Sequence, residues 1–142
     1  MAEQVKSILC YGDSNTWGYN PRTGERHDYG YRWTTVAGTM LGPGYRLIPE
    51  GLNGRTTVLE DTIEPGRNGL RYLRPCLVSH KPLALAQEYR LVAEELGVPF
   101  LDAAAHVECP FPDGIHLDAE GQRTLGEVLA RWIREELLEG AT

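Results

Sequence analysis

The fold of this chain is decided by its first strand and the turn behind it, which read VKSILCYGDSNTWGY over residues 5–19. Residues 5–12 are mostly apolar and have the length of a short strand. The triplet Gly12-Asp13-Ser14 follows where the strand gives way to a turn. Because ligands of open parallel sheets bind outside the carboxyl ends of the strands, a serine at this place can point its hydroxyl into a cleft.

Two interpretations of this serine are open. In the first, Ser14 is a nucleophile at the start of a helix, whose free backbone N–H groups stabilise a developing oxyanion. In the second, Asp13 or Ser14 merely caps that helix, a position at which Ser and Asp are preferred residues.

The rest of the chain alternates between strands and helices. Two further strands are predicted at residues 45–49 and 98–103. Helices are predicted at 32–41, within 70–82, at 83–96 and at 119–138, the last capped by Asp118. This alternation predicts an α/β fold with a mostly parallel sheet. The length of 142 residues fits one domain, residues 1–142, without a linker.

Composition narrows the class of protein. The formal net charge is −6, from 14 basic and 20 acidic residues, which argues against nucleic acid and anionic membranes as partners. Three widely spaced cysteines and no signal-type apolar segment predict a cytoplasmic protein. We expect no metal and no cofactor, because His106 with Cys109 lacks the second ligand pair that a structural zinc needs.

A second group of chemically suggestive residues is the segment PDGIHLD at residues 112–118. Asp113 and His116 are three apart, so one turn can present both side chains to the same cleft. A nucleophilic serine needs a base, and that base needs an orienting carboxylate. The alternative is that Asp113 only stabilises a turn and His116 is a surface histidine.

Taken together, these segments resemble the SGNH (GDSL-type) hydrolases, and most closely their small arylesterase and acyltransferase branch. ILCYGDSNTWGY (8–19) resembles the family's first block, GLNGRTT (51–57) its second and PDGIHLD its last. The resemblance implies a serine esterase with the catalytic triad Ser14, Asp113 and His116, and an oxyanion hole formed by the N–H groups of Ser14 and Gly54. The substrate-pocket candidates are Asn15, Trp17 and Asn53, with Tyr19 and Trp33 as further aromatic candidates.

Two departures from the family pattern matter. Asn15 stands where the name-giving motif has leucine. The family's third block, a Gly-x-Asn-Asp motif on a central strand, has no counterpart, and the break falls near residues 83–85. The resemblance therefore implies a flavodoxin-like three-layer α/β/α fold with a parallel sheet reduced to about three strands, in which the last strand pairs with the first. Exposed sheet edges then favour a homo-oligomer.

The expected function is a serine esterase or acyl transferase that acts on small carboxylic esters through an acyl-enzyme, with weakened activity. One alternative is an inactive remnant of the fold that binds or scaffolds. The other is an unrelated flavodoxin-like binding module, which would need a phosphate-binding loop that residues 12–19 do not resemble.

Overall fold

One parallel sheet organises the molecule. The computed structural model describes residues 5–80, 85–86, 97, 99–110 and 113–136. The strand order is β2-β1-β3, so β1 (Lys6–Gly12) is central. It pairs over its full length with β2 (Tyr45–Gly51) and briefly with β3 (Leu85–Ala86), both in parallel. The three-stranded parallel sheet that the sequence predicted is confirmed.

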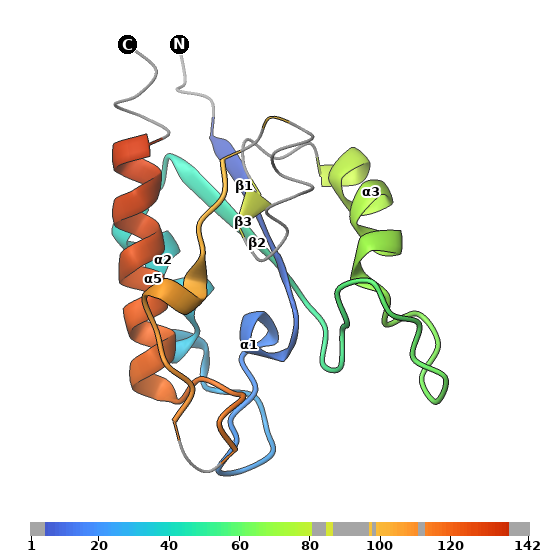
Figure 1. Ribbon diagram of the computed structural model, residues 1–142. Coiled ribbons are helices and arrows are strands. Elements are labelled where there is room, and N and C mark those ends of the chain that lie inside the picture. Colours follow the sequence, from blue (N-terminus) through green and yellow to red (C-terminus); the bar gives the residue numbers. More distant parts are fainter. Residues whose placement is uncertain (1–4, 81–84, 87–96, 98, 111–112, 137–142) are drawn as a thin grey trace.

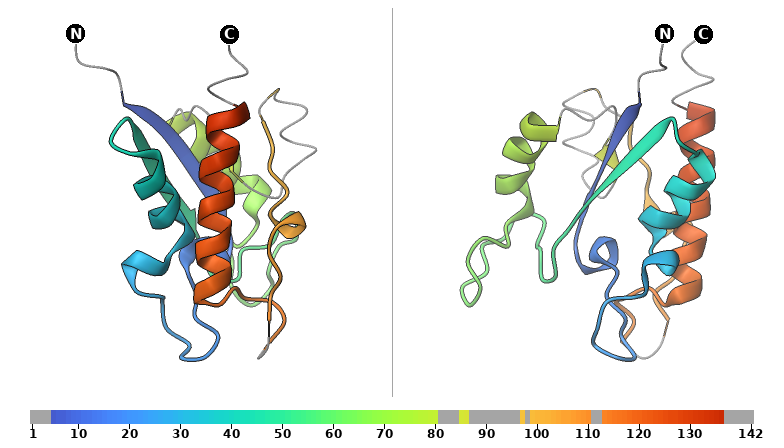
Figure 2. Two further views of the ribbon diagram at one scale, coloured as in Figure 1. Left: turned by 90° about the vertical axis from the view of Figure 1, so that its left-hand side faces the viewer. Right: turned by 180° about the vertical axis from the view of Figure 1, so that it is seen from behind.

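The central strand separates two cores, because successive side chains of a strand point to opposite faces. Ile8 and Cys10 belong to the core on one face, and Leu9 and Tyr11 to the core on the other. All four are fully buried. Figure 2 shows helices on both sides of the sheet, which makes the three layers of the predicted α/β/α fold.

The helices divide unequally between the two faces. On one face lie α2 (Trp33–Leu41) and α5 (Ala119–Arg134), and on the other α3 (Gly69–His80) (Figure 1). The remaining elements are short: α1 (Ser14–Trp17), η1 (Tyr29–Tyr31) and η2 (Ala103–Ala105). The helix predicted within 70–82 is therefore α3, and the helix predicted at 32–41 is α2.

The last helix carries the amphipathic pattern that the sequence indicated. Asp118 caps it by accepting a hydrogen bond from the Gly121 N–H at 2.8 Å. Leu125, Leu129 and Ile133 are buried against the sheet and α2. Val128 and Trp132 are partly buried and pack against the same core. The predicted residues 137–138 of this helix lie outside the described part of the chain.

Two predicted elements need correction. Residues 99–102 form no strand, and residues 103–105 form η2 instead, although Leu101 still packs into the core. The strand beside β1 is Leu85–Ala86, inside the segment predicted as a helix; the other residues of that helix lie outside the described ones. When Leu85–Ala86 pairs with the free edge of β1, backbone N–H and C=O groups of both segments gain hydrogen-bond partners. For these two residues, this gain outweighs the helical spacing of the apolar residues.

No helix among the described residues has the length and apolarity required to cross a lipid bilayer.

Candidate active site

The serine turn lies at the carboxyl end of the central strand. Asp13 follows β1 and is the N-cap of α1, since its Oδ1 accepts a hydrogen bond from the Asn15 N–H at 2.8 Å. The capping interpretation is therefore correct for Asp13. It leaves the hydroxyl of Ser14, the first residue of α1, available for another partner.

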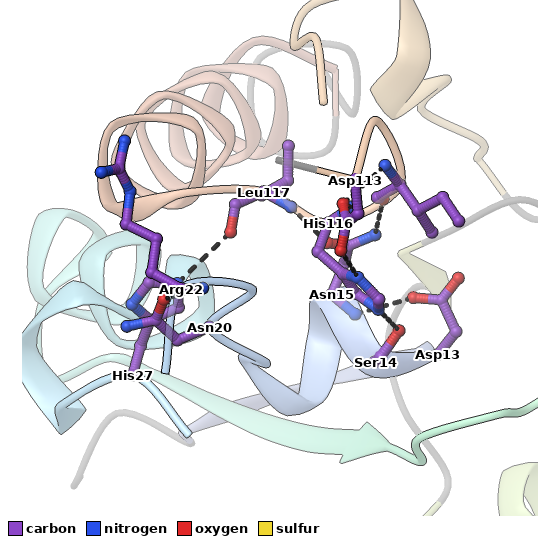
Figure 3. Close-up of polar contacts among 10 residues, drawn as sticks. Asp13, Ser14, Asn15, Asn20, Arg22, His27, Asp113, His116 and Leu117 are labelled. Carbon is purple, nitrogen blue, oxygen red and sulfur yellow. Dashed lines mark hydrogen bonds and ion pairs between the residues drawn. The ribbon is translucent and has the colours of Figure 1, made fainter. Parts of the chain in front are cut away.

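That partner is His116. Its Nε2 lies 2.9 Å from the Ser14 Oγ, and its Nδ1 lies 2.7 Å from Oδ2 of Asp113 (Figure 3). With the proton on Nδ1, the ring donates to the carboxylate and accepts from the serine hydroxyl. Figure 3 shows the imidazole between the two oxygen-bearing side chains, although Ser14 and His116 are far apart in sequence. The three side chains thus form the continuous hydrogen-bonded chain that acyl-transfer chemistry requires.

Asp113 has two tasks at once. Its Oδ1 accepts the backbone N–H groups of Ile115 and His116 at 2.9 and 3.0 Å, while its Oδ2 holds the imidazole. The hydrogen bond from the His116 side chain, followed by those from the two backbone N–H groups, lowers the pKa of this carboxyl to about 2. Asp113 is therefore ionised near neutral pH, as a group that stabilises an imidazolium must be.

Asn15 connects the serine turn to the loop that carries the acid and the base. Its Nδ2 donates to the carbonyl oxygen of Ile115 at 3.2 Å, and its Oδ1 accepts from the Leu117 N–H at 2.8 Å. These two bonds bracket His116. Asn15, predicted as a substrate-pocket residue on the basis of its place beside Ser14, thus fixes the position of the base.

A buried amide extends this connection into the core. Gln122 of α5 is fully buried; its Nε2 donates to the carbonyl oxygen of Asn15 at 3.0 Å, and its Oε1 accepts from the Trp33 N–H at 3.0 Å. Sequence reasoning missed Gln122. The available signal was a polar residue that lies one turn before Leu125, on the same face of the last helix as the apolar stripe.

Ser14 and His116 open onto a cleft of about 450 Å³. The Tyr19 ring forms one wall, with its centroid 4.4 Å from that of His116. The described residues around the cleft are Asp13, Ser14, Tyr19, Asn53, Gly54, Arg55, Ile115 and His116. The second predicted block therefore lies beside the nucleophile.

The loop behind β2, which follows that strand and carries Asn53, Gly54 and Arg55, is held in place by an arginine and fits closely because of its glycines. Arg55 Nη1 donates to the carbonyl oxygens of Gly12 and Glu50 at 2.8 and 2.5 Å, and these bonds tie the loop to the ends of β1 and β2. Gly54 adopts a φ of +71°, which side-chain-bearing residues rarely adopt. Gly51 has no room for a Cβ atom, which would lie 2.1 Å from the Trp17 backbone nitrogen. The glycines thus let the loop lie against the serine turn.

Asn53 has an unusual environment for a polar side chain. Its Oδ1 is buried and has no hydrogen-bond partner in the described part of the structure, whereas its backbone oxygen accepts from Arg67 Nη1 at 2.6 Å. A buried oxygen without a partner costs about 1–3 kcal/mol. A buried polar atom of this kind needs a specific explanation, and a role in the neighbouring cleft is one such explanation.

The structure does not bring every predicted residue to the cleft. Trp17 is absent from its described lining, and its ring lies under the Arg26 guanidinium at 5.1 Å. Trp33 is a core residue, 1% exposed.

Two histidines outside the cleft have defined partners. His27 is buried, with its Nε2 3.3 Å from the Leu117 carbonyl oxygen (Figure 3). His80 ends α3, with its Nε2 3.3 Å from a carboxylate oxygen of Glu50.

Comparison with known proteins supports the same class. No protein-family profile and no curated protein matches the chain. Among solved structures, a carbohydrate acetylesterase family member from Sinorhizobium meliloti is 27% identical, with 93% of this chain and 99% of that chain covered and a TM-score of 0.80. The aryl esterase of M. smegmatis is 26% identical, with coverage of 92% and 99% and a TM-score of 0.79.

A third neighbour is a putative lipolytic protein of the G-D-S-L family from Desulfitobacterium hafniense DCB-2, 16% identical, with coverage of 89% and 98% and a TM-score of 0.53. It bears on the fold alone. The chain has the fold of the SGNH (GDSL-type) hydrolases. The esterases among its structural neighbours support a hydrolase function.

Proposed function

We propose that the chain is a serine esterase that transfers the acyl group of a small carboxylic ester through an acyl-enzyme. The observation that carries this proposal is the unbroken hydrogen-bonded chain from Ser14 Oγ through His116 to Asp113, at 2.9 and 2.7 Å. Capping and turn formation alone would account for Asp13 and Asp113, but not for an imidazole between a serine hydroxyl and a carboxylate.

In the first step, the Ser14 oxygen attacks the ester carbonyl while His116 Nε2 takes the hydroxyl proton. Asp113 holds the Nδ1 proton and stabilises the imidazolium that forms. When the tetrahedral intermediate collapses, Nε2 returns the proton to the leaving alcohol and the acyl group stays on Ser14. Water, or another acceptor such as an alcohol or peroxide, then releases the acyl group by the same steps in reverse order.

The oxyanion is stabilised by the backbone N–H groups of Ser14 and Gly54, with Asn53 beside them. Gly54 and Asn53 line the cleft together with Ser14, which supports this assignment. Helix α1 has only four residues, so the benefit comes from individual N–H groups rather than from a helix dipole. Loss of one oxyanion donor costs about 100- to 1000-fold in rate, so two backbone donors are compatible with a slow esterase.

The substrate is a small ester with a short acyl group. A cleft of about 450 Å³ that is shared by Tyr19, Asn53 and Ile115 has room for such a molecule. The printed names of the structural neighbours, carbohydrate acetylesterase and aryl esterase, agree with an acetyl group on a sugar or aryl alcohol. We propose no cofactor for this reaction, since attack, proton transfer and charge stabilisation are all assigned to protein groups.

The single domain of residues 1–142 is, in this proposal, an SGNH hydrolase without the strand–helix–strand unit that would follow residue 83. The brief pairing of Leu85–Ala86 with β1 supports this, because two residues leave most of that edge without a partner strand in the described part of the chain.

We also propose that the chain forms a homo-oligomer in the cytoplasm. Val58, Leu59, Ile63 and Val78 are more than half exposed, and contact with a second copy would bury them. None of the three cysteines is in a disulfide in the described part of the chain, which fits a reducing compartment. Analytical ultracentrifugation tests the assembly: a single monomeric species at micromolar concentration would contradict it.

A fluorophosphonate labelling experiment tests the proposed chemistry. We expect one label per chain by intact mass, and none in the variants Ser14→Ala and His116→Ala. The matched controls Ser79→Ala and His106→Ala, both outside the cleft, should label like the wild type. A folded wild-type protein that takes no label would contradict the esterase and leave a non-catalytic member of the fold.

A further inference from the structure

A second cluster of chemically active side chains lies away from the triad, between β2 and α3. It consists of Glu50, Cys76 and His80, whose carboxylate oxygen, Sγ and ring nitrogen all lie within 4.8 Å of one another. Cys76 and His80 are four residues apart on α3, so they lie on the same face of that helix. Glu50 is the penultimate residue of β2. The cluster therefore forms only when the helix packs against the strand.

The three donors suit a particular class of ion. A thiolate, an imidazole and a carboxylate together are ligands of Zn²⁺ and of its analogue Co²⁺, whereas Mg²⁺ and Ca²⁺ take oxygen ligands. Zinc–ligand bonds of about 2.0–2.3 Å put the ligands of a tetrahedral site about 3.3–3.8 Å apart. The His80 and Glu50 atoms, at 3.3 Å, already have this separation. A separation of up to 4.8 Å to the third atom exceeds this range by about 1 Å, which the half-buried Glu50 and His80 side chains would have to close on binding.

Burial around the cluster resembles that of a metal centre open on one side. Cys76 is 2% exposed and packs with Leu9, Tyr11 and Leu73. The side chains of His80 and Glu50 remain 31% and 29% exposed. An ion would thus reach the sulfur through the two outer ligands, with a fourth position open to water.

One acidic and one basic side chain act on the Cys76 sulfur. Burial, followed by the nearby Glu50 carboxylate, raises the pKa of the Cys76 thiol, while Arg55 lowers it, and the net result is a pKa of about 11. The carboxylate is thus close enough to act on the sulfur. Arg55 opposes a cation, but its guanidinium is held 4.1 Å from the Tyr11 ring centroid and donates to backbone oxygens. A divalent ion with one carboxylate and one thiolate forms a neutral set, which removes the cost of an unpaired buried charge.

We propose that Glu50, Cys76 and His80 bind one zinc-class divalent ion, which fastens helix α3 to the end of strand β2. The sequence offered no sign of this site, because Glu50 and the two helix residues come together only in the folded chain. Glu50 lies shortly before the loop that carries Asn53 and Gly54, so the ion would also restrain that loop. The site stands apart from Ser14 and holds whether or not the triad is active.

Cobalt titration of the tag-free, chelator-treated protein tests this proposal. We expect one equivalent of Co²⁺ to produce a thiolate-to-cobalt charge-transfer absorption in the near ultraviolet, which Zn²⁺ then displaces. We expect Zn²⁺ also to raise the melting temperature. Neither readout depends on esterase activity, and Ser14→Ala should bind like the wild type.

Variants separate this site from adventitious binding. Cys76→Ser should abolish the charge-transfer absorption, and His80→Gln should weaken binding at least about 10-fold, since even outer partners of metal ligands have effects of this size. His80 is half-buried at the end of α3, so His80→Gln tests the site even if Cys76→Ser fails to fold. Cys109→Ser and His106→Gln are the matched controls and should bind normally. No absorption from the folded wild type, or equal binding by His80→Gln, would overturn the proposal.

Discussion

Substitution of Asn15 by alanine tests whether the serine turn positions the base. The change removes two hydrogen bonds, Asn15 Nδ2 to the Ile115 oxygen at 3.2 Å and the Leu117 N–H to Asn15 Oδ1 at 2.8 Å. At about 0.5–1.5 kcal/mol for each bond, the free energy of unfolding should fall by about 1–3 kcal/mol. The first bond is long and exposed, so the lower half of this range is expected.

The effect on catalysis should exceed the effect on folding. Both bonds hold the segment that carries His116, and a displacement of about 1 Å at a reacting group costs about 100-fold in rate. We therefore expect kcat for p-nitrophenyl acetate to fall about 100-fold in Asn15→Ala with KM little changed. Asn15→Asp keeps the acceptor for the Leu117 N–H but replaces the donor to the Ile115 oxygen with an anionic oxygen, so its kcat should also lie below that of the wild type.

Steady-state kinetics, the rate of fluorophosphonate labelling and urea unfolding together make the assay. Asn20→Ala is the matched control, because Asn20 also accepts a backbone hydrogen bond, from the Arg22 N–H at 3.0 Å, but in an exposed turn. The reasoning is refuted if Asn15→Ala labels within about twofold of the wild-type rate, or if it loses stability and activity no more than Asn20→Ala does.

Three further predictions concern the loop behind β2 and the triad acid. Gly51→Ala should lower the free energy of unfolding by about 1–3 kcal/mol and also reduce activity, because its Cβ would meet the Trp17 backbone nitrogen at 2.1 Å; Gly44→Ala, with no atom within 4 Å of its Cβ, should leave the urea midpoint unchanged. Asn53→Ala should reduce kcat about 10-fold or more without lowering the free energy of unfolding, since the buried Oδ1 makes no bond that the variant would lose and its removal relieves the cost of an unpaired buried oxygen; a stability loss without a kcat loss would contradict this. Asp113→Asn should reduce kcat by about 10,000-fold. The pKa of Asp113 is lowered from 3.8 to about 2 in the folded chain, so between about pH 4 and pH 2 the unfolded chain binds more protons than the folded one. The excess stability of the wild type over Asp113→Asn should therefore be constant above about pH 5 and shrink between about pH 4 and pH 2. Urea unfolding at several pH values measures this difference.

The sequence by itself determined the parts of this protein that local chemistry controls. An apolar run followed by Gly12-Asp13-Ser14 predicted a strand and a turn at its carboxyl end, and the stripe of Leu125, Leu129 and Ile133 predicted the final helix with its cap at Asp118. The three-residue spacing of Asp113 and His116 predicted an acid and a base on one turn. Hydrophobic periodicity, capping and turn formation act over a few residues, so a sequence displays them directly.

Only the tertiary structure decided what depends on contacts between distant segments. Leu85–Ala86 is a strand because the edge of β1 offers it a partner, and residues 99–103 are not one, whatever their local propensity. Gln122 bonds to Asn15 because α5 docks beside the serine turn. The Trp17 ring lies against the Arg26 guanidinium instead of lining the cleft. Glu50, Cys76 and His80 meet for the same reason. Such contacts depend on which surfaces pack together, and the pattern of any one segment does not contain that information.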